Sequence, residues 1–282
     1  MTNPNILVIG EYGIDIFKEC SVSRLAPEVP VPVCIPIKTT TNPGLAANVV
    51  ENIRSLRPTW KSIYHITNIT KITKTRYIDA VSGHWFLRVD ENDELPKEEM
   101  LTIDGFKAVY GDRNHLKQFN AVVVSDYCKG LISVRFLDWL IAECHPINVP
   151  TFVDTKKCFG TFAPPFCGKI NEKEYLQSKI HNPELHAHNF IKTMGKDGAV
   201  LWQNKQSPSF IKTRNVEVSC QSGAGDSFLA SLVCCYLETY DLTKAVEYAN
   251  IVAGIAVSKR NVVAVTQEEV LAVLNSENKQ SQ

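Results

Sequence analysis

The stretch QSGAGDSFLASLVCCYL, residues 221–237, joins a glycine-containing turn to an apolar segment of helical length. The apolar segment predicts a buried helix of which only the first turn stays open. Gly223 and Gly225 leave the backbone of that turn without side chains. Because unpaired N–H groups and the positive end of the helix dipole meet at a helix start, the stretch predicts an anion site.

Asp226 stands at the same turn and gives the stretch a second property. A carboxylate repels a bound phosphate, but it is well placed to take a proton from the group that attacks that phosphate. Phosphoryl transfer needs both an electropositive cradle and a positioned carboxylate. The alternative interpretation is that Asp226 only caps a helix that follows a flexible turn, as acidic residues often do.

Alternation of strands and helices predicts the fold around this turn. Short apolar runs at 5–10, 121–127 and 149–154 each end in polar residues, which is typical of strands buried on both faces. The segments 44–56 and 133–145 have helical patterns. We therefore predict a single α/β domain over residues 1–282, with a doubly wound parallel sheet flanked by helices. Ligands of such sheets bind at the carboxyl ends of the strands.

Two segments predict a small β-sheet lid beside the main sheet, with strands at about 20–40 and 83–93. In PEVPVPVCIPIK (27–38), apolar residues alternate with prolines that share one parity, so the strand loses N–H donors along one edge only. Such a strand suits the edge of a sheet. Since a small flap cannot bury the apolar face of Val31, Val33, Ile35 and Ile37 alone, we expect a homodimer through the lid.

Composition and charge limit the possible partners. The chain has 282 residues, 44% hydrophobic and 21% charged, which suits a globular protein with a sizeable core. Its formal net charge is +0, so we expect neither a nucleic-acid partner nor a membrane partner. The local basic cluster Lys71, Lys74 and Arg76 is interpreted as the solvated face of a strand.

The cysteines and the N-terminus indicate the compartment. Nine cysteines without C-x-x-C spacing predict free thiols in a reducing, cytoplasmic environment. No apolar run reaches transmembrane length, and Asn3-Pro4 leads directly into a strand instead of a signal peptide.

Several motifs together resemble the PfkB, or ribokinase-like, family of sugar kinases. GAGDSF (223–228) resembles the family signature, Thr193-x-Gly195-x-x-Gly198 resembles its nucleotide-binding turn, and Asn171-x-x-Glu174 resembles its NxxE motif. The segments 10–15 and 43–49 (PGLAANV) are similar to its sugar-binding region. Ordered motifs along nearly the whole chain are much harder to obtain by chance than one motif alone.

A narrower resemblance concerns the bacterial D-glycero-D-manno-heptose-7-phosphate kinases of lipopolysaccharide-precursor synthesis. It rests on RLAPEVPVPV (24–33), KTRYI (74–78) with LRVD (87–90), and SDYCKG (125–130). The function that it implies is ATP-dependent phosphorylation of heptose 7-phosphate at the anomeric hydroxyl. Two alternatives remain open: a kinase for another sugar or nucleoside, and a catalytically silent ligand-binding relative.

The resemblance also implies roles for individual residues. Asp226 is the general base, and the amides of Gly223 and Gly225 hold the transferred phosphoryl group. The implied cofactors are ATP and Mg²⁺. The implied binding residues are Thr193, Gly195, Gly198 and Asn250 for ATP, Asn171 and Glu174 for Mg²⁺ through water, and Asp15, Gly44 and Asn48 for the sugar. Arg88 and Lys129 are predicted to face the 7-phosphate, since a phosphosugar requires positive charge at its far end.

Four departures from the family pattern concern the substrate and activity. Cys220 stands where the family has an Asp linked to monovalent-cation activation, and Leu45 replaces the second glycine of a sugar-binding pair. Cys128 replaces the glycine of SDYGKG. The segment between Asn52 and Lys74 is short, which predicts the loss of part of one sheet edge.

Overall fold

An eight-stranded sheet forms the centre of the molecule in the computed structural model, which describes residues 3–280. Its strand order is β12-β11-β10-β9-β8-β7-β1-β4. The six strands from β10 to β4 are parallel, whereas β11 and β12 run antiparallel to their neighbours. The strands are β1 (Ile6–Gly10), β4 (Ile63–Ile66), β7 (Ala121–Asp126), β8 (Thr151–Thr155), β9 (Cys167–Asn171), β10 (Asn189–Thr193), β11 (Ala199–Gln203) and β12 (Ser209–Ile211).

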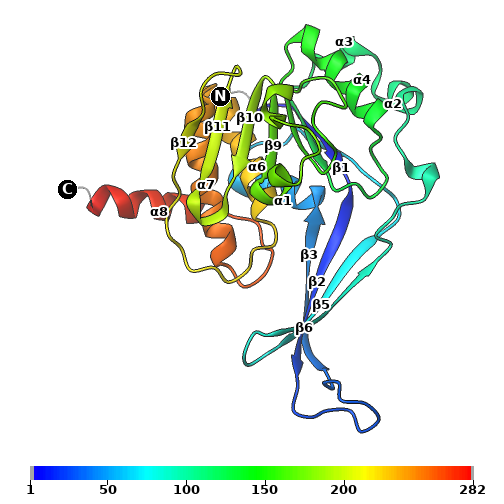
Figure 1. The fold of residues 1–282 in the computed structure, drawn as a ribbon, viewed down its shortest axis with the longest axis vertical. Helices are drawn as coiled ribbons and strands as arrows, with labels where there is room; N and C mark the ends of the chain where they lie inside the picture. The colour runs from blue at the N-terminus through cyan, green and yellow to red at the C-terminus, as the bar shows by residue number, and fades with distance from the viewer. Residues whose placement is uncertain (1–2, 281–282) are drawn as a thin grey trace.

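Helices cover both faces of this sheet, as predicted for a doubly wound fold (Figure 1). Along β1, Ile6 and Val8 point into the core beneath α1, α6 and α7, whereas Leu7 and Ile9 point into the core beneath α2 and α4. Burial on both faces explains why β1, β7 and β8 are continuous apolar runs in the sequence. The helices are α1 (Ala46–Leu56), α2 (Ile103–Tyr110), α3 (Arg113–Leu116), α4 (Val134–Cys144), α5 (Glu172–Leu176), α6 (Ala224–Thr239), α7 (Leu242–Ser258) and α8 (Gln267–Gln280).

A second sheet of four strands extends away from the main body, and we call it the lid (Figure 1). Its strand order is β3-β2-β5-β6. Strands β2 and β5 are parallel and the other neighbours are antiparallel. The strands are β2 (Tyr12–Ser21), β3 (Ile35–Leu45), β5 (Ile72–Asp79) and β6 (Trp85–Glu91).

The lid confirms part of the prediction and corrects its boundaries. The segment 83–93 contains β6, but the segment 20–40 is mostly loop, with a single bridge between Leu25 and Pro32. The alternating pattern of residues 27–38 predicts a strand that starts too early, because only the end of this segment, from Ile35, pairs with β2. Within its true bounds β3 is an edge strand, as predicted, although it contains only Pro36 of the alternating prolines.

Register places charged residues on one face of the lid. Asp15 lies opposite Asn42 and Lys74, and Phe17 lies opposite Thr40 and Arg76. Residues two positions apart in a strand point to the same side, so these side chains share a face. The interpretation of Lys74 and Arg76 as a solvated surface is wrong. Arg76 is buried, because its guanidinium pairs with Asp15 and lies over the rings of Phe17 and Trp85.

The cysteines are free, as predicted: all nine lie within the described residues and none forms a disulfide. Within residues 3–280, no helix has both the length and the apolar character needed to cross a membrane. One edge strand of the main sheet is β4, which lies in the short segment between Asn52 and Lys74.

Candidate active site at the start of helix α6

Asp226 lies in the first turn of α6 and is almost completely buried. Its carboxylate accepts hydrogen bonds from the Tyr127 hydroxyl at 2.6 Å and from the Asn48 side-chain amide at 3.0 Å. Burial is the largest influence on this carboxyl and raises its pKa to about 6, against the opposing effect of the two hydrogen bonds. A carboxylate with such a pKa is suited to accept a proton near neutral pH.

The turn before Asp226 has the geometry that its glycines predicted. Gly223 is the N-cap of α6 with φ of 82°, a backbone conformation that glycine adopts without strain. Among the described residues, no side-chain oxygen caps this helix. The carboxylate of Asp226 instead faces Asn48 and Tyr127, so the alternative that Asp226 is simply a helix cap is wrong.

Three acidic side chains surround Tyr127, which follows β7. Burial is the main cause that raises the pKa of the Tyr127 hydroxyl, followed by the charges of Asp226, Asp154 and Asp15. These carboxylates come from α6, β8 and β2. Asp15 and Asn48, the predicted sugar ligands, therefore lie in the same site as Asp226, the predicted base: Asp15 lies near Tyr127, and Asn48 contacts Asp226 directly.

Sequence reasoning missed three residues of this centre: Tyr127, Asp154 and Lys169. Lys169 lies on β9, is almost completely buried and donates a hydrogen bond to Asp154 on β8. A Cβ atom added to Gly225 would lie 3.1 Å from Nζ of Lys169, so the ammonium group lies beside the glycine turn. The signal in the sequence was a charged residue inside an otherwise uncharged strand, CGKIN.

Asn171 and Glu174, the predicted Mg²⁺ residues, form a capping box at the start of α5. Glu174 also pairs with Lys156. Within residues 3–280, no cluster of three or more acidic, His or Cys side chains could enclose a metal ion. The oxygen donors Asn171 and Glu174 suit a hydrated Mg²⁺ that is held through water and nucleotide phosphates rather than by a closed protein cage.

The residues predicted to bind ATP lie in two places, the turn between β10 and β11 and the helix α7. Thr193 ends β10, and Gly195 and Gly198 belong to the turn that leads into β11. Asn250 on α7 is buried and donates hydrogen bonds to the carbonyls of Ile211 and Lys212. Its amide thus fixes the end of β12 to α7, and contact of any of these four residues with ATP stays a prediction.

Asp15 and Gly44 meet where β2 pairs with β3. A Cβ atom added to Gly44 would lie 2.6 Å from a carboxylate oxygen of Asp15, so any larger residue would displace that buried carboxylate. Leu45, the departure beside it, is buried with φ of 57° and contacts Gly13. The extra side chain is therefore packed against β2.

The predicted phosphate-facing residues Arg88 and Lys129 belong to one network of charges. Arg88 donates two hydrogen bonds to Asp90, at 2.7 and 2.6 Å, and Lys129 donates one to Asp93 at 2.5 Å. Lys74 lies between them, 3.8 Å from Asp90 and 3.7 Å from Asp93. Burial lowers the pKa of Lys74 most, followed by the charge of Arg88.

Four buried polar atoms among the described residues have no hydrogen-bond partner, and all lie in the lid or directly beside it. They are Thr40 Oγ1, Asn42 Nδ2, Arg76 Nε and Asp93 Oδ1. A buried polar group without a partner costs about 1–3 kcal/mol, so such groups usually meet a ligand or water. These atoms support a polar ligand on the charged face of the lid.

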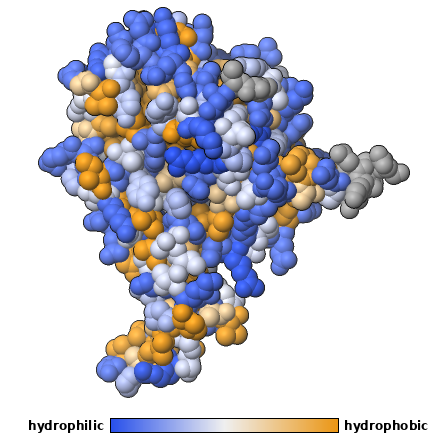
Figure 2. Space-filling model, turned by 180° about the vertical axis from the view of Figure 1, so that it is seen from behind, coloured by the Kyte–Doolittle hydropathy of each residue, from blue (hydrophilic) through white to orange (hydrophobic). Residues whose placement is uncertain are grey.

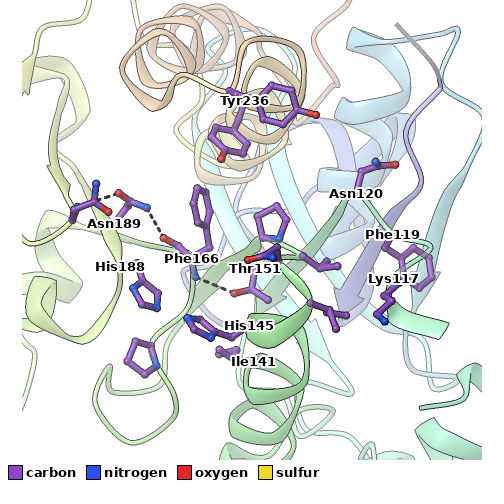
Figure 3. Close-up of a pocket in the computed structure, with 17 residues that line it drawn as sticks. Lys117, Phe119, Asn120, Ile141, His145, Thr151, Phe166, His188, Asn189 and Tyr236 are labelled. Atoms are coloured by element: carbon purple, nitrogen blue, oxygen red, sulfur yellow. Dashed lines mark hydrogen bonds between the residues drawn. The ribbon is translucent and has the colours of Figure 1, made fainter. Parts of the chain in front are cut away.

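A cavity of about 640 Å³ lies at the opposite edge of the sheet (Figure 3). Asn120, Thr151 and Asn189 stand at or just before the amino ends of β7, β8 and β10 and contribute to its lining. The stacked imidazoles of His145 and His188 line it as well. It contains none of the predicted site residues, whereas ligands of parallel sheets bind at the carboxyl ends.

The arrangement of fold and site is similar to that of ribokinase-like carbohydrate kinases. Residues 163–269, which include β9, the nucleotide turn and the α6 site, match the model of the "pfkB family carbohydrate kinase" family. The match confirms the resemblance that the motifs indicated.

Solved structures confirm the fold. A ribokinase from Thermotoga maritima superposes with a TM-score of 0.67 at 16% identity, covering 96% of this chain and 99% of its own. An Arabidopsis thaliana ribokinase complexed with ribose and ATP gives a TM-score of 0.68 at 12% identity, covering 97% and 99%. At these identities the likeness concerns the fold alone.

Curated relatives carry a more specific name. A "Bifunctional protein HldE" from Campylobacter jejuni subsp. doylei is 29% identical over an alignment of 303 positions, which covers 95% of this chain and 64% of that protein. One from Caulobacter sp. is 26% identical, covering 96% and 63%. The chain thus spans about 64% of the length of the first of these relatives.

The departure Cys128 leads to a stability prediction. Cys128 has φ of 56°, a conformation that costs a residue with a Cβ about 1–2 kcal/mol relative to glycine. Its thiol makes only long contacts, at 3.5 Å to Lys157 and 3.8 Å to Asp126. We expect Cys128→Gly to raise the free energy of unfolding by about 1 kcal/mol in urea titrations. Cys128→Ser is the control, because it loses the thiol but keeps Cβ; a Gly variant less stable than the Ser variant would contradict the prediction.

Proposed function

We propose that this protein is an ATP- and Mg²⁺-dependent kinase of a sugar phosphate. One observation carries the proposal: a buried carboxylate with a raised pKa, Asp226, lies at an uncapped, glycine-lined helix start. The helix start supplies an electropositive cradle for a phosphoryl group, and the carboxylate supplies a base for the attacking hydroxyl.

In the proposed reaction, the sugar hydroxyl attacks the γ-phosphorus of ATP while its proton passes to Asp226. The bond from the γ-phosphorus to the bridging oxygen of ADP breaks, so the products are the phosphorylated sugar and ADP. Amides of the Gly223–Gly225 turn hold the phosphoryl oxygens as they gain charge. Asn48 and Tyr127 hold the carboxylate in place through their hydrogen bonds.

Mg²⁺ supplies positive charge that neutralises the nucleotide phosphates when it is bound. Asn171 and Glu174 would hold it through water, at the carboxyl end of β9. Lys156 pairs with Glu174 and lies near further carboxylates; burial lowers its pKa, but Asp154, Glu174 and Asp226 raise it overall. This lysine therefore stays charged beside the proposed phosphate site.

The proposed substrate is D-glycero-D-manno-heptose 7-phosphate, phosphorylated at its anomeric hydroxyl. The motifs that resemble those of heptose kinases support a heptose substrate. Cations of the lid face support an anionic end, and the unpartnered atoms of Thr40 and Asn42 support polar contacts to the sugar. Free thiols at all nine cysteines suit the reducing cytoplasm, which we propose as the compartment.

A coupled ADP-release assay across a panel of sugars tests the proposal. The panel contains heptose 7-phosphate, the unphosphorylated heptose, fructose 6-phosphate, ribose and a nucleoside. We expect the highest kcat/KM for heptose 7-phosphate and a large loss without the phosphate. A preference for another sugar or nucleoside would favour a different substrate, and no sugar-dependent ADP release would favour a silent relative.

Potassium should have little effect on the rate. Cys220 is buried in an apolar cluster with Phe17, Ile78 and Val262, and its thiol replaces a hard carboxylate oxygen. Hard cations prefer oxygen ligands, so this position is unsuited to an alkali ion. Rates measured in potassium chloride and in the chloride of a bulky organic cation should agree, and a large stimulation by potassium would contradict this expectation.

A homodimer through the lid is a further part of the proposal. The lid and its loops expose many apolar side chains, which gather at its end (Figure 2). They include Leu25, Val31, Ile35, Ile37 and Leu87. A four-stranded sheet with such a surface needs a cover, and a second copy of the same lid is self-complementary.

Light scattering on point variants tests the dimer. We expect a dimer for the parent protein at micromolar concentration and a monomer for Ile37→Glu, because a buried charge opposes association. Val109→Glu is the matched control: Val109 is exposed on α2, away from the lid, so this variant should remain dimeric. A monomeric parent protein would refute the dimer.

A further inference from the structure

Lys169 lies beside the α6 turn, but the family resemblance did not assign it a role and the proposed reaction does not yet use it. We propose that Lys169 contacts the phosphoryl group during its transfer, as a substrate-binding residue of the same site. The inference rests on the proposed function and adds a specific residue to it. Three observations carry it: the place of the ammonium group, its burial and its pairing.

The ammonium group of Lys169 lies beside the backbone of Gly225. A Cβ atom at Gly225 would lie 3.1 Å from Nζ of Lys169, which is tighter than an ordinary contact, so glycine lets the ammonium group lie beside the turn without being displaced. Gly225 is one of the amides proposed to hold the phosphoryl group. An anion bound at the turn therefore lies within reach of a point charge as well as of the N–H groups.

Burial makes this charge costly unless it has a function or a full set of partners. Lys169 is 4% exposed, and its ammonium group has three donors. One of them is used by Asp154, on the neighbouring strand. Since an ammonium group can donate three hydrogen bonds, Lys169 can keep Asp154 as its partner and still bind a phosphoryl oxygen.

The pairing with Asp154 explains how the lysine is held ready. Asp154 and Lys169 lie opposite each other in register on β8 and β9, so the sheet fixes both stems. Lys169 also acts on the base, because its positive charge lowers the pKa of Asp226 against the larger effect of burial. Lys169 therefore favours an ionised base and a bound phosphoryl group together.

Three variants separate a role in transfer from a role in folding. Lys169→Met removes the charge and keeps the length, Lys169→Arg keeps the charge, and Lys169→Met with Asp154→Asn removes the buried pair altogether. Lys157→Met is the matched control, because Lys157 forms another largely buried ion pair, with Asp126 at the end of β7, and has no role in the proposed site. Each variant is compared for kcat, thermal stability, and affinity for ADP and for a non-hydrolysable ATP analogue.

We expect Lys169→Met and the double variant to lose about 10²-fold in kcat, the scale of one lost donor to a developing oxyanion. Both should also lose most of the preference for the ATP analogue over ADP, while Lys157→Met keeps it. Lys169→Arg should recover part of the loss. A folded double variant with parent kcat and nucleotide preference would overturn the proposal, since the lysine would then serve only to neutralise Asp154.

The affinity measurements keep this test separate from the test of the reaction. If no sugar stimulates ADP release by the parent protein, the proposed kinase function fails. Calorimetry with the ATP analogue and ADP then still decides on Lys169: a preference lost in Lys169→Met supports the phosphate contact, and an unchanged preference overturns it.

Discussion

Asp226→Asn is expected to lower kcat by roughly 10²- to 10⁴-fold, the usual effect of removing a general base. The amide keeps the size of the side chain and one oxygen for the Tyr127 hydroxyl, but it cannot accept a proton. The amide nitrogen meets the donor of Asn48, and loss of that hydrogen bond is offset by relief of a buried charge. We therefore expect the free energy of unfolding to change by no more than about 1 kcal/mol.

The dependence of kcat on pH provides a second test of Asp226 as the base. The pKa of Asp226 is raised to about 6, so kcat should fall as the pH drops below that value and the base becomes protonated. The groups that influence this titration are Tyr127, Asn48, Asp154 and Lys169. Tyr127→Phe removes a hydrogen bond that lowers the pKa, and should move the acid limb to higher pH while keeping the base.

Calorimetry with ATP completes the test, because nucleotide binding should persist in Asp226→Asn. Normal stability together with near-normal turnover would mean that Asp226 is not the base. The proposed mechanism would then be wrong, even though the fold and the family match would stand.

Arg76→Met should be the most destabilising substitution in the lid. Arg76 and Asp15 are both buried and form an ion pair, and removal of one partner of such a pair costs about 3–5 kcal/mol. The substitution also removes the stacking of the guanidinium on Phe17 and Trp85. Chemical denaturation followed by tryptophan fluorescence measures the effect, since Trp85 reports directly on the lid.

Two variants control for this prediction. Arg88→Met breaks an ion pair that is half-exposed on its arginine side, and should cost less than about 1 kcal/mol. Arg76→Met with Asp15→Asn removes the uncompensated charge and should recover part of the lost stability. Equal stability of Arg76→Met and Arg88→Met would show that burial of the Asp15–Arg76 pair has no energetic consequence.

The strands and helices near the site could be predicted from local patterns. β1, β7 and β8 are apolar on both faces because helices cover both sides of the sheet, and this gives continuous runs that stand out in a sequence. The lid was harder to predict. One face of β5 carries Lys74 and Arg76, whose charges are paired within the fold, so its sequence looks like a solvated strand.

The partners of Asp226, the proposed base, could not be predicted in the same way. Asn48 and Tyr127 are distant from Asp226 in the sequence, and they meet it only because α1, β7 and α6 converge at one edge of the sheet. Lys129 also has a partner that is distant in the sequence, because Asp93, which follows β6, accepts its hydrogen bond. The partner of Arg88 is local: Asp90 lies two residues further along the same strand.

Local sequence patterns were enough to predict the main sheet, the glycine turn before α6 and the carboxylate of Asp226 in that turn. These features depend on backbone conformation, hydrophobic period and residue type, which act over a few neighbouring positions. The raised pKa of Asp226, the burial of Arg76 and the approach of Lys169 to Gly225 depend instead on the folded arrangement of distant segments. Electrostatic energy depends on distance and burial in three dimensions, and residues far apart in the chain determine both.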